Sequence, residues 1–415
     1  MENYAMESNW KKNTALFLAG QALTLLGTML VQYAIVWHIT LTTQSGTMMM
    51  LFTLIGFLPM FFISPFAGVW ADRYNRKYII NIADGIIALF SLAVAVLLMC
   101  GIDSYAILFV CAFVRSLGQG VHMPAVGAFI PQIVPEEHLM KVGGMQTSIM
   151  SLITLTAPMA SAALMTFTPL ETLFLVDVAT AAIGISIVAF FVKIPAKGLA
   201  EIEAAKKKGT AYFHDLREGL RYIRNHGYVL RTIILTAFFL FFFAPAGFLT
   251  PLQVVRNFGE EVWRLSAIEI AFSAGMVLGG ILIVAWGGFK NRVHTMALAI
   301  ALAGVFVACL GFVPFFWLYL VIMAVLGITL PVYNTPAMVL LQTTVDQAFM
   351  GRVISVFTMV SSSMMPMGML LFGPLADSVS IDYILIATGL LLTLLYIPMM
   401  TSKTLREAGA RREES

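Results

Sequence analysis

The sequence predicts an all-α membrane protein with twelve transmembrane helices arranged in two six-helix bundles. Three observations predict this fold class. Of the 415 residues, 60% are hydrophobic and only 11% are charged, whereas soluble proteins have about 25% charged residues. Apolar runs long enough to cross a bilayer, which takes about 20 residues, recur along the whole chain. One long polar stretch divides these runs into two sets of six.

The apolar runs are continuous, with no alternation of apolar and polar residues. They lie at 14–38, 46–71, 78–100, 104–130, 142–166, 170–193, 229–254, 265–287, 293–313, 315–341, 353–376 and 381–401. Backbone groups find no water inside a bilayer, so a spanning segment is either a helix or a strand of a closed barrel. Barrel strands alternate in polarity, and the continuous runs therefore predict helices.

The polar stretch sets the domain boundaries. We expect an N-terminal six-helix bundle at 1–193, a cytoplasmic linker at 194–228, and a C-terminal bundle with a cytoplasmic tail at 229–415. Within the linker, Tyr212 to Ile223 carries apolar residues at helical spacing, which is typical of an amphipathic helix at a membrane surface.

The basic residues predict the orientation. With both termini in the cytoplasm, 22 of the 25 Lys and Arg residues lie in cytoplasmic segments, Arg256 and Arg264 lie outside, and Arg115 lies within a span. Cytoplasmic loops of membrane proteins are enriched in Lys and Arg. The first apolar run is too long for a signal-peptide core and lacks a cleavage site, so we expect it to be retained as a span.

Several classes of function have no support in the sequence. The sequence contains no nucleotide-binding loop, metal-ligand cluster or nucleophile–base pattern. We therefore expect that the protein is not an enzyme, has no metal site or cofactor, and is not driven directly by ATP hydrolysis. No folded domain is available to bind nucleic acid. The three cysteines lie in or beside apolar runs, which argues against a disulfide framework.

A polar turn between the second and third spans is the strongest local signal. A glycine, an aspartate and a basic cluster lie within ten residues: Gly68, Asp72, Arg73, Asn75, Arg76 and Lys77. We expect the glycine to allow close helix approach and the aspartate to cap a helix or pair with an arginine. A simpler interpretation is a basic anchor at the lipid headgroups.

The two halves of the chain contain similar segments. Residues 70–76 (WADRYNR) and 286–292 (WGGFKNR) share Trp, Asn and Arg at the same spacing, each after the second span of its half. The fourth spans contain His-Met-Pro-Ala at 122–125 and Asn-Thr-Pro-Ala at 334–337. Many secondary transporters are built from such repeats, with the substrate site between them.

The turn from Gly68 to Lys77 resembles the loop signature of the major facilitator superfamily, with Asn75 where that family usually has Gly. Asn tolerates a left-handed backbone, so we expect a mild departure. Segments such as Arg115-Ser-Leu-Gly, His122-Met-Pro-Ala and Val134-Pro-Glu-Glu are similar to macrolide-efflux (Mef-type) proteins. The stretch 30–46 also resembles clostridial-type tetracycline efflux proteins.

This resemblance implies a monomeric drug:proton antiporter of the bacterial cytoplasmic membrane, driven by the proton gradient. Its expected partners are the lipid bilayer and a small amphipathic substrate. The antiporter signature of the fifth span is degenerate here: only Gly144 and Pro158 match, and Ala157 is one of its small substitutes. Small residues still permit close packing of this span.

Charged residues within the spans are candidates for proton coupling, because they are costly in lipid and functional by default. These candidates, together with one histidine, are Asp84, Arg115, Asp177, Glu269 and His122. In the family that the chain resembles, an arginine at the place of Arg115 is linked to proton coupling. The alternative for each carboxylate is a packing or rim role, and for His122 a hydrogen-bonded packing role.

Amphipathic and aromatic side chains are candidates for the substrate pocket. Four lie roughly on one face of the first span and two lie in the seventh: Gln21, Gln32, Tyr33, Trp37, Phe238 and Phe242. Adaptable, Met-rich surfaces suit promiscuous binding. For any single aromatic residue, packing against lipid or another helix is the simpler interpretation.

The sequence therefore favours proton-coupled efflux of a macrolide-like or other amphipathic antibiotic. Tetracycline efflux and export of a native metabolite such as a siderophore are the alternatives. A sensor or scaffold that has lost transport is disfavoured, because such a protein gains nothing from embedded charges. Uptake by symport is disfavoured by the resemblance to exporters.

Overall fold

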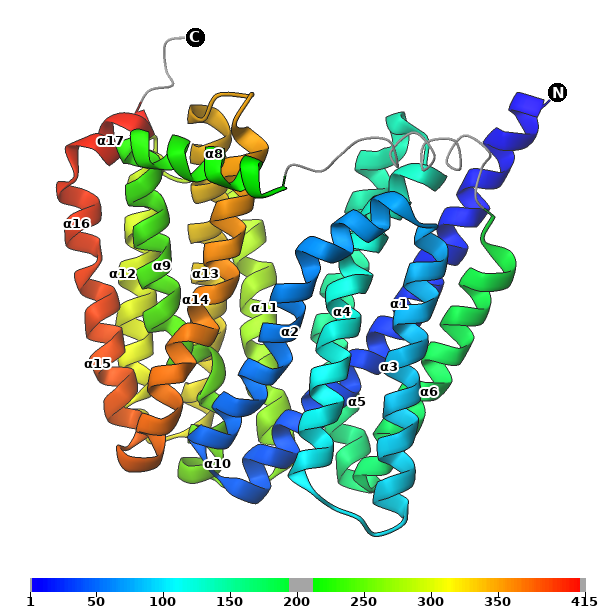
Figure 1. Ribbon diagram of the computed structural model, residues 1–415. Coiled ribbons are helices and arrows are strands. Elements are labelled where there is room, and N and C mark those ends of the chain that lie inside the picture. Colours follow the sequence, from blue (N-terminus) through cyan, green and yellow to red (C-terminus); the bar gives the residue numbers. More distant parts are fainter. Residues whose placement is uncertain (1, 194–211, 411–415) are drawn as a thin grey trace. The chain divides into compact units, whose positions relative to one another are not determined.

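The structure, a computed structural model, describes residues 2–193 and 212–410, with side chains at 10–71, 73–193 and 217–410. All regular structure in these ranges is helical. Twelve helical segments there are long and apolar enough to cross a membrane, and each overlaps one predicted apolar run. The predicted fold class is confirmed (Figure 1).

The chain divides into two compact units. Unit 1 comprises Met1–His38 and Phe52–Thr210, and unit 2 comprises Ile39–Leu51 and Ala211–Ser415. Residues 39–51 join the first two helices of the chain, yet they pack with unit 2. The sequence repeat does not reveal this assignment, because the segment belongs by sequence to the first half.

The first half of the sequence forms six spanning helices. They are α1 (Glu2–Thr43), α2 (Gly46–Arg73), α3 (Arg76–Met99), α4 (Tyr105–Ile133), α5 (Leu139–Phe167) and α6 (Leu170–Ser186). A 3₁₀ turn, η1 (Glu136–His138), precedes α5, and a π-helical turn, η2 (Ile187–Phe191), ends the sixth span.

The second half begins with the amphipathic α8 (Tyr212–Asn225), which covers the segment predicted as a surface helix and crosses one end of the unit 2 bundle in Figure 1. The remaining helices are α9 (Gly227–Phe248), α10 (Thr250–Phe258), α11 (Val262–Trp286), α12 (Arg292–Leu310), α13 (Phe316–Thr344), α14 (Met350–Ser378), α15 (Ile381–Leu394), α16 (Tyr396–Thr401) and α17 (Lys403–Ala410). The pairs α9–α10 and α15–α16 each make one span.

Glycines set the closest helix contact in unit 2. A Cβ at Gly275 of α11 would collide with backbone atoms of Ala324 in α13, and a Cβ at Gly327 would collide with the backbone of α11 at Phe272. Lipid is as apolar as leucine, so helices in a membrane gain association energy from close backbone packing. These glycines therefore hold α11 and α13 together.

The repeated Trp…Asn-Arg segments perform the same structural task in both halves. The Asn75 side chain accepts a hydrogen bond from the Lys77 amide (3.1 Å) at the start of α3, and Asn291 accepts one from the Val293 amide (3.0 Å) at the start of α12. Asn75 has φ −66° and ψ 111°. Asn75 therefore does not use the left-handed conformation that Asn tolerates, since an N-cap residue takes an extended conformation.

Candidate transport site

The turn between α2 and α3 is tied to unit 1 by its basic residues. Arg76 donates to the carbonyls of Ala71 (2.8 Å) and Ala128 (2.8 Å). Lys77 Nζ donates to the carbonyls of Ala189 (2.7 Å) and Val192 (2.8 Å), where the sixth span ends. The final carbonyls of a helix lack partners within it, so Lys77 near the end of η2 and Arg76 near the end of α2 satisfy such groups. Arg76 also contacts a carbonyl within α4.

The remaining predicted residues of this turn are Gly68, Asp72 and Arg73. A Cβ added at Gly68 would meet no described atom within 4 Å, so the part of the chain that the structure describes shows no close helix approach at Gly68. Arg73 is exposed. The side chain of Asp72 lies outside the described residues.

Arg115 lies at the centre of a buried polar network that joins four helices. Its Nη1 is 2.6 Å from Asp177 Oδ2 in α6 and 2.7 Å from Ser91 Oγ in α3, and its Nη2 donates to the Thr28 carbonyl in α1 at 2.9 Å. The side chains of Arg115 and Asp177 are 4% and 1% exposed. The network neutralises both charges inside the bundle.

Asp84 of α3 and His122 of α4 form a separate pair. Nε2 of His122 is 3.3 Å from Oδ1 of Asp84, and the two side chains are 12% and 3% exposed. The contact falls within ion-pair distance. It is not a hydrogen bond, and neither ring nitrogen of His122 has a hydrogen-bond partner among the described residues. The pair therefore places a carboxylate and an imidazole side by side inside unit 1.

A cavity in unit 1 opens onto this pair. It measures about 60 Å³, and a buried water needs roughly 10–15 Å³ in the same measure, so it has room for several waters. Its polar lining comes from four helices, α1, α3, α4 and α5, and comprises Gln21, Thr24, Thr28, Asp84, Gln119, His122 and Gln146. The rest is largely apolar, as at Leu25, Val126 and Ile149. Arg115 and Asp177 do not line it.

Glu269 lies in α11, which belongs to unit 2. It is half-buried, and no hydrogen bond or ion pair to another described residue involves it. The five residues predicted to couple protons therefore separate into a buried network, a cavity pair and an isolated carboxylate. The sequence predicted them as one set because it cannot show which of them meet.

The predicted pocket residues are also divided. Of the four on α1, only Gln21 lines the cavity. Trp37 is fully buried and packs against Tyr33 with ring centroids 5.4 Å apart, and Gln32 is exposed. Phe238 of α9 belongs to unit 2.

The two α9 candidates form a small aromatic surface of unit 2. Phe238 is 49% exposed and stacks on Phe242 at 6.1 Å. Such a surface suits an apolar substrate or lipid equally.

The three residues of the degenerate fifth-span signature behave differently in α5. Ala157 and Pro158 are buried in unit 1, as expected for close packing. Gly144 is exposed, and a Cβ there would meet nothing within 4 Å. No described atom therefore packs closely on Gly144 within unit 1, and its packing role stays a prediction.

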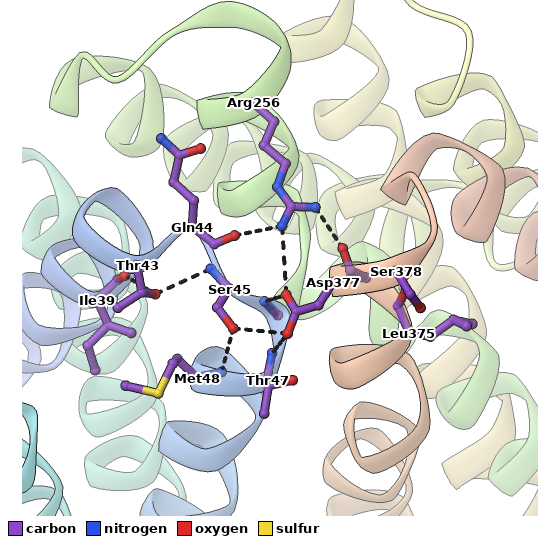
Figure 2. Close-up of polar contacts among 12 residues, drawn as sticks. Ile39, Thr43, Gln44, Ser45, Thr47, Met48, Arg256, Leu375, Asp377 and Ser378 are labelled. Atoms are coloured by element: carbon purple, nitrogen blue, oxygen red, sulfur yellow. Dashed lines mark hydrogen bonds and ion pairs between the residues drawn. The ribbon is translucent and has the colours of Figure 1, made fainter.

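Figure 2 shows a polar cluster within unit 2 that the sequence did not reveal. Asp377, near the end of α14, receives the segment that joins α1 to α2. Its carboxylate accepts hydrogen bonds from the Gly46 amide (2.6 Å), the Thr47 amide (3.0 Å) and the Ser45 hydroxyl (2.9 Å). These are the first amides of α2, so Asp377 caps that helix from more than three hundred residues away.

Arg256 of α10 completes this Asp377 cluster. It donates to the carbonyls of Ala376 (2.7 Å) and Gln44 (2.6 Å), and its Nη2 is 3.7 Å from the Asp377 carboxylate. Gln44 has φ 45°, the one positive φ among the described non-glycine residues. Its side chain also donates to Glu260 at 2.7 Å. Contacts on both its carbonyl and its side chain hold Gln44 in this uncommon conformation.

Sequence reasoning missed Gln119, Gln146 and Asp377. One face of α4 carries Arg115, Gln119 and His122, which are spaced i, i+4 and i+7. This polar stripe in an apolar span was the signal that could have identified Gln119. Gln146 and Asp377 have no such pattern.

The comparisons with known proteins agree with this architecture. Macrolide efflux protein A of Streptococcus pyogenes is 28% identical over 394 residues, which cover 94% of this chain and 95% of that protein. Macrolide efflux protein A of Enterococcus faecalis is 28% identical over 328 residues, 79% of this chain and 100% of that protein.

Among solved structures, an inward-facing bacterial homologue of the iron transporter ferroportin matches with a TM-score of 0.68 at 16% identity, covering 94% of this chain and 99% of that one. At this identity the likeness shows the fold alone. A family model described as Major Facilitator Superfamily matches residues 17–369. With twelve spans, this match and full-length similarity to efflux proteins, the chain is a transporter that belongs to the Major Facilitator Superfamily.

Proposed function

We propose that this transporter exports macrolide-like or other amphipathic antibiotics across the bacterial cytoplasmic membrane in exchange for protons. The names of the relatives support the substrate class and the direction. The observation that carries proton coupling is the Asp84–His122 pair, an embedded carboxylate and imidazole that line a cavity of water-sized space. The excess of basic residues in the predicted cytoplasmic loops supports cytoplasmic termini.

The pair supplies the chemistry that coupling needs. With neutral His122 and ionised Asp84, it carries one negative charge, and a single added proton makes it neutral overall, whichever group holds it. Exchange of a proton between two groups 3.3 Å apart requires only a small adjustment of either side chain. Polar cavities of this size hold water, which gives protons a route to Asp84.

The Arg115–Asp177 network has a different role in this proposal. Both charges are paired at 2.6 Å and sealed from the cavity. Removing one partner from such a pair leaves a bare charge in a low-dielectric bundle. We therefore assign the network to holding α1, α3, α4 and α6 together, and Asp84 to the proton.

Everted membrane vesicles test the assignment. After respiration acidifies the vesicle lumen, an exported drug that exchanges for protons should relieve the quenching of a pH-sensitive dye. We expect Asp84→Asn to abolish this response and His122→Gln to reduce it strongly, with both variants present in the membrane at normal levels. Glu137→Gln is the matched control, because Glu137 is an exposed carboxylate of unit 1. Drug-dependent proton movement in Asp84→Asn at the wild-type rate would remove Asp84 from the coupling step.

Susceptibility tests identify the substrate. An efflux-deficient bacterium expressing the chain is challenged with macrolides, tetracyclines, lincosamides and dyes, with and without a protonophore. We expect selective macrolide resistance that the protonophore removes. Tetracycline resistance alone would favour the tetracycline alternative, and no resistance despite membrane expression would favour a native metabolite.

A further inference from the structure

The cavity of unit 1 brings together polar side chains that have no hydrogen-bond partners. Gln21, Gln119 and Gln146 make no hydrogen bond to any other described residue. Both ring nitrogens of His122 and the Nε2 of Gln21 are buried and unpaired. Asp84 has only its contact with His122. Buried polar groups are almost always paired in folded proteins, so the unpaired ring nitrogens of His122 and the unpaired Nε2 of Gln21 are unusual.

These groups together define the chemistry of a ligand. Among the described residues, Asp84 is the only carboxylate that lines the cavity, and no lysine or arginine lines it. A cation that donates hydrogen bonds is therefore its complement. The glutamine amides both donate and accept, which suits a hydroxyl group. The apolar walls suit alkyl groups on or near the cation.

The size of the cavity limits the group that fits. Its 60 Å³ is roughly four to six times the 10–15 Å³ that one water needs in this measure, and that many waters occupy about 120–180 Å³ of liquid. The space therefore suits one substituted six-membered ring and excludes a whole amphipathic antibiotic. It is a subsite for one part of a larger molecule.

We infer that this cavity binds an amino-alcohol group of the exported molecule, an alkylated ammonium beside a hydroxyl, as on an amino sugar. Asp84 binds the ammonium, and the glutamines Gln21 and Gln146 hydrogen-bond the hydroxyl. The inference rests on the proposed function and names the part of the substrate that unit 1 recognises.

Three compounds with one scaffold test it. They are erythromycin, its N-oxide, which carries no net charge on the sugar amine, and its 2′-O-acetyl ester, which lacks the neighbouring free hydroxyl. Binding to the purified full-length protein in lipid nanodiscs is measured by competition with radiolabelled erythromycin. We expect the N-oxide to bind at least about tenfold more weakly, since hydrogen bonds to charged groups are the stronger ones, and the ester several-fold more weakly.

Variants assign each preference to a residue. Asp84→Asn should remove the preference for the amine over the N-oxide and keep the preference for the free hydroxyl. Gln146→Leu should do the reverse. Thr147→Val is the matched control, because Thr147 is the adjacent residue of α5 but is exposed and does not line the cavity. It should leave both preferences unchanged.

The outcomes separate this inference from the proposed function. If all three compounds bind and are exported equally, antibiotic export stands and the amino-alcohol site is wrong. If Asp84→Asn retains the full amine preference, the ammonium binds elsewhere and the inference is also overturned. If no macrolide binds or is exported at all, the proposed substrate class is wrong, and the inference that rests on it is wrong as well.

Discussion

The Asp377 cluster allows a quantitative prediction about local stability. Replacing Asp377 with Ala removes the acceptor for the Gly46 and Thr47 amides and for the Ser45 hydroxyl. Loss of a helix N-cap costs about 1 kcal/mol, and hydrogen bonds to a charged group are worth about 1.5–3 kcal/mol. Because the Asp377 side chain is 32% exposed, we take a reduced total of about 2–3 kcal/mol for the three contacts.

Hydrogen exchange measures this loss directly. Each 1.4 kcal/mol changes a local opening equilibrium tenfold, so amide exchange in a peptide covering 44–50 should accelerate by roughly 30- to 150-fold in Asp377→Ala. Ser378→Ala is the matched control, since the neighbouring hydroxyl bonds only within its own helix. Both variants are measured in nanodiscs against the unchanged exchange of other segments.

Two results would refute the reasoning. If the amide exchange rate of residues 44–50 in Asp377→Ala lies within twofold of the wild-type rate, the cap contributes no measurable stability to this segment. Equal acceleration in Ser378→Ala would show that any change at the end of α14 loosens the segment, without a specific role for the carboxylate.

Three further predictions concern packing. Arg115→Ala should lower the thermal stability of the purified transporter sharply, because breaking a buried pair costs about 3–5 kcal/mol, and adding Asp177→Leu should restore part of the loss; an additive loss in the double variant would exclude a coupled pair. Gly327→Val should prevent folding by forcing α11 and α13 apart, which size-exclusion chromatography detects, whereas Gly280→Ala, with no atom within 4 Å of the added Cβ, should fold normally. Asn75→Ala should cost about 1 kcal/mol of stability through loss of the α3 cap, and an unchanged melting temperature would contradict this.

Polar groups within the spans show where sequence reasoning stopped. The sequence predicted that Asp84, Arg115, Asp177 and His122 matter, because charges in lipid are costly. It did not predict that Arg115 pairs with Asp177 and Asp84 with His122. Both pairs join different helices, and pairing depends on helix rotation and depth, which no local pattern records.

The glutamines of the cavity and the cap on α2 illustrate the same limit. Gln146 looks like any polar residue of an apolar helix until α5 places it beside Asp84 and His122. Asp377 looks like a rim carboxylate until the structure brings it to the Gly46 amide, 331 positions away in the sequence. Neither contact follows from neighbours in the chain.

By itself, the sequence determined the twelve spanning helices and the two-half repeat. The reason is that lipid offers no hydrogen bonds, so each long apolar run must form a helix whatever its partners are. Only the tertiary structure decided which embedded charges neutralise one another, which of them face a cavity, and that residues 39–51 pack with the second unit. These outcomes depend on side chains that meet across helices, where close packing and the cost of unpaired polar groups select one arrangement.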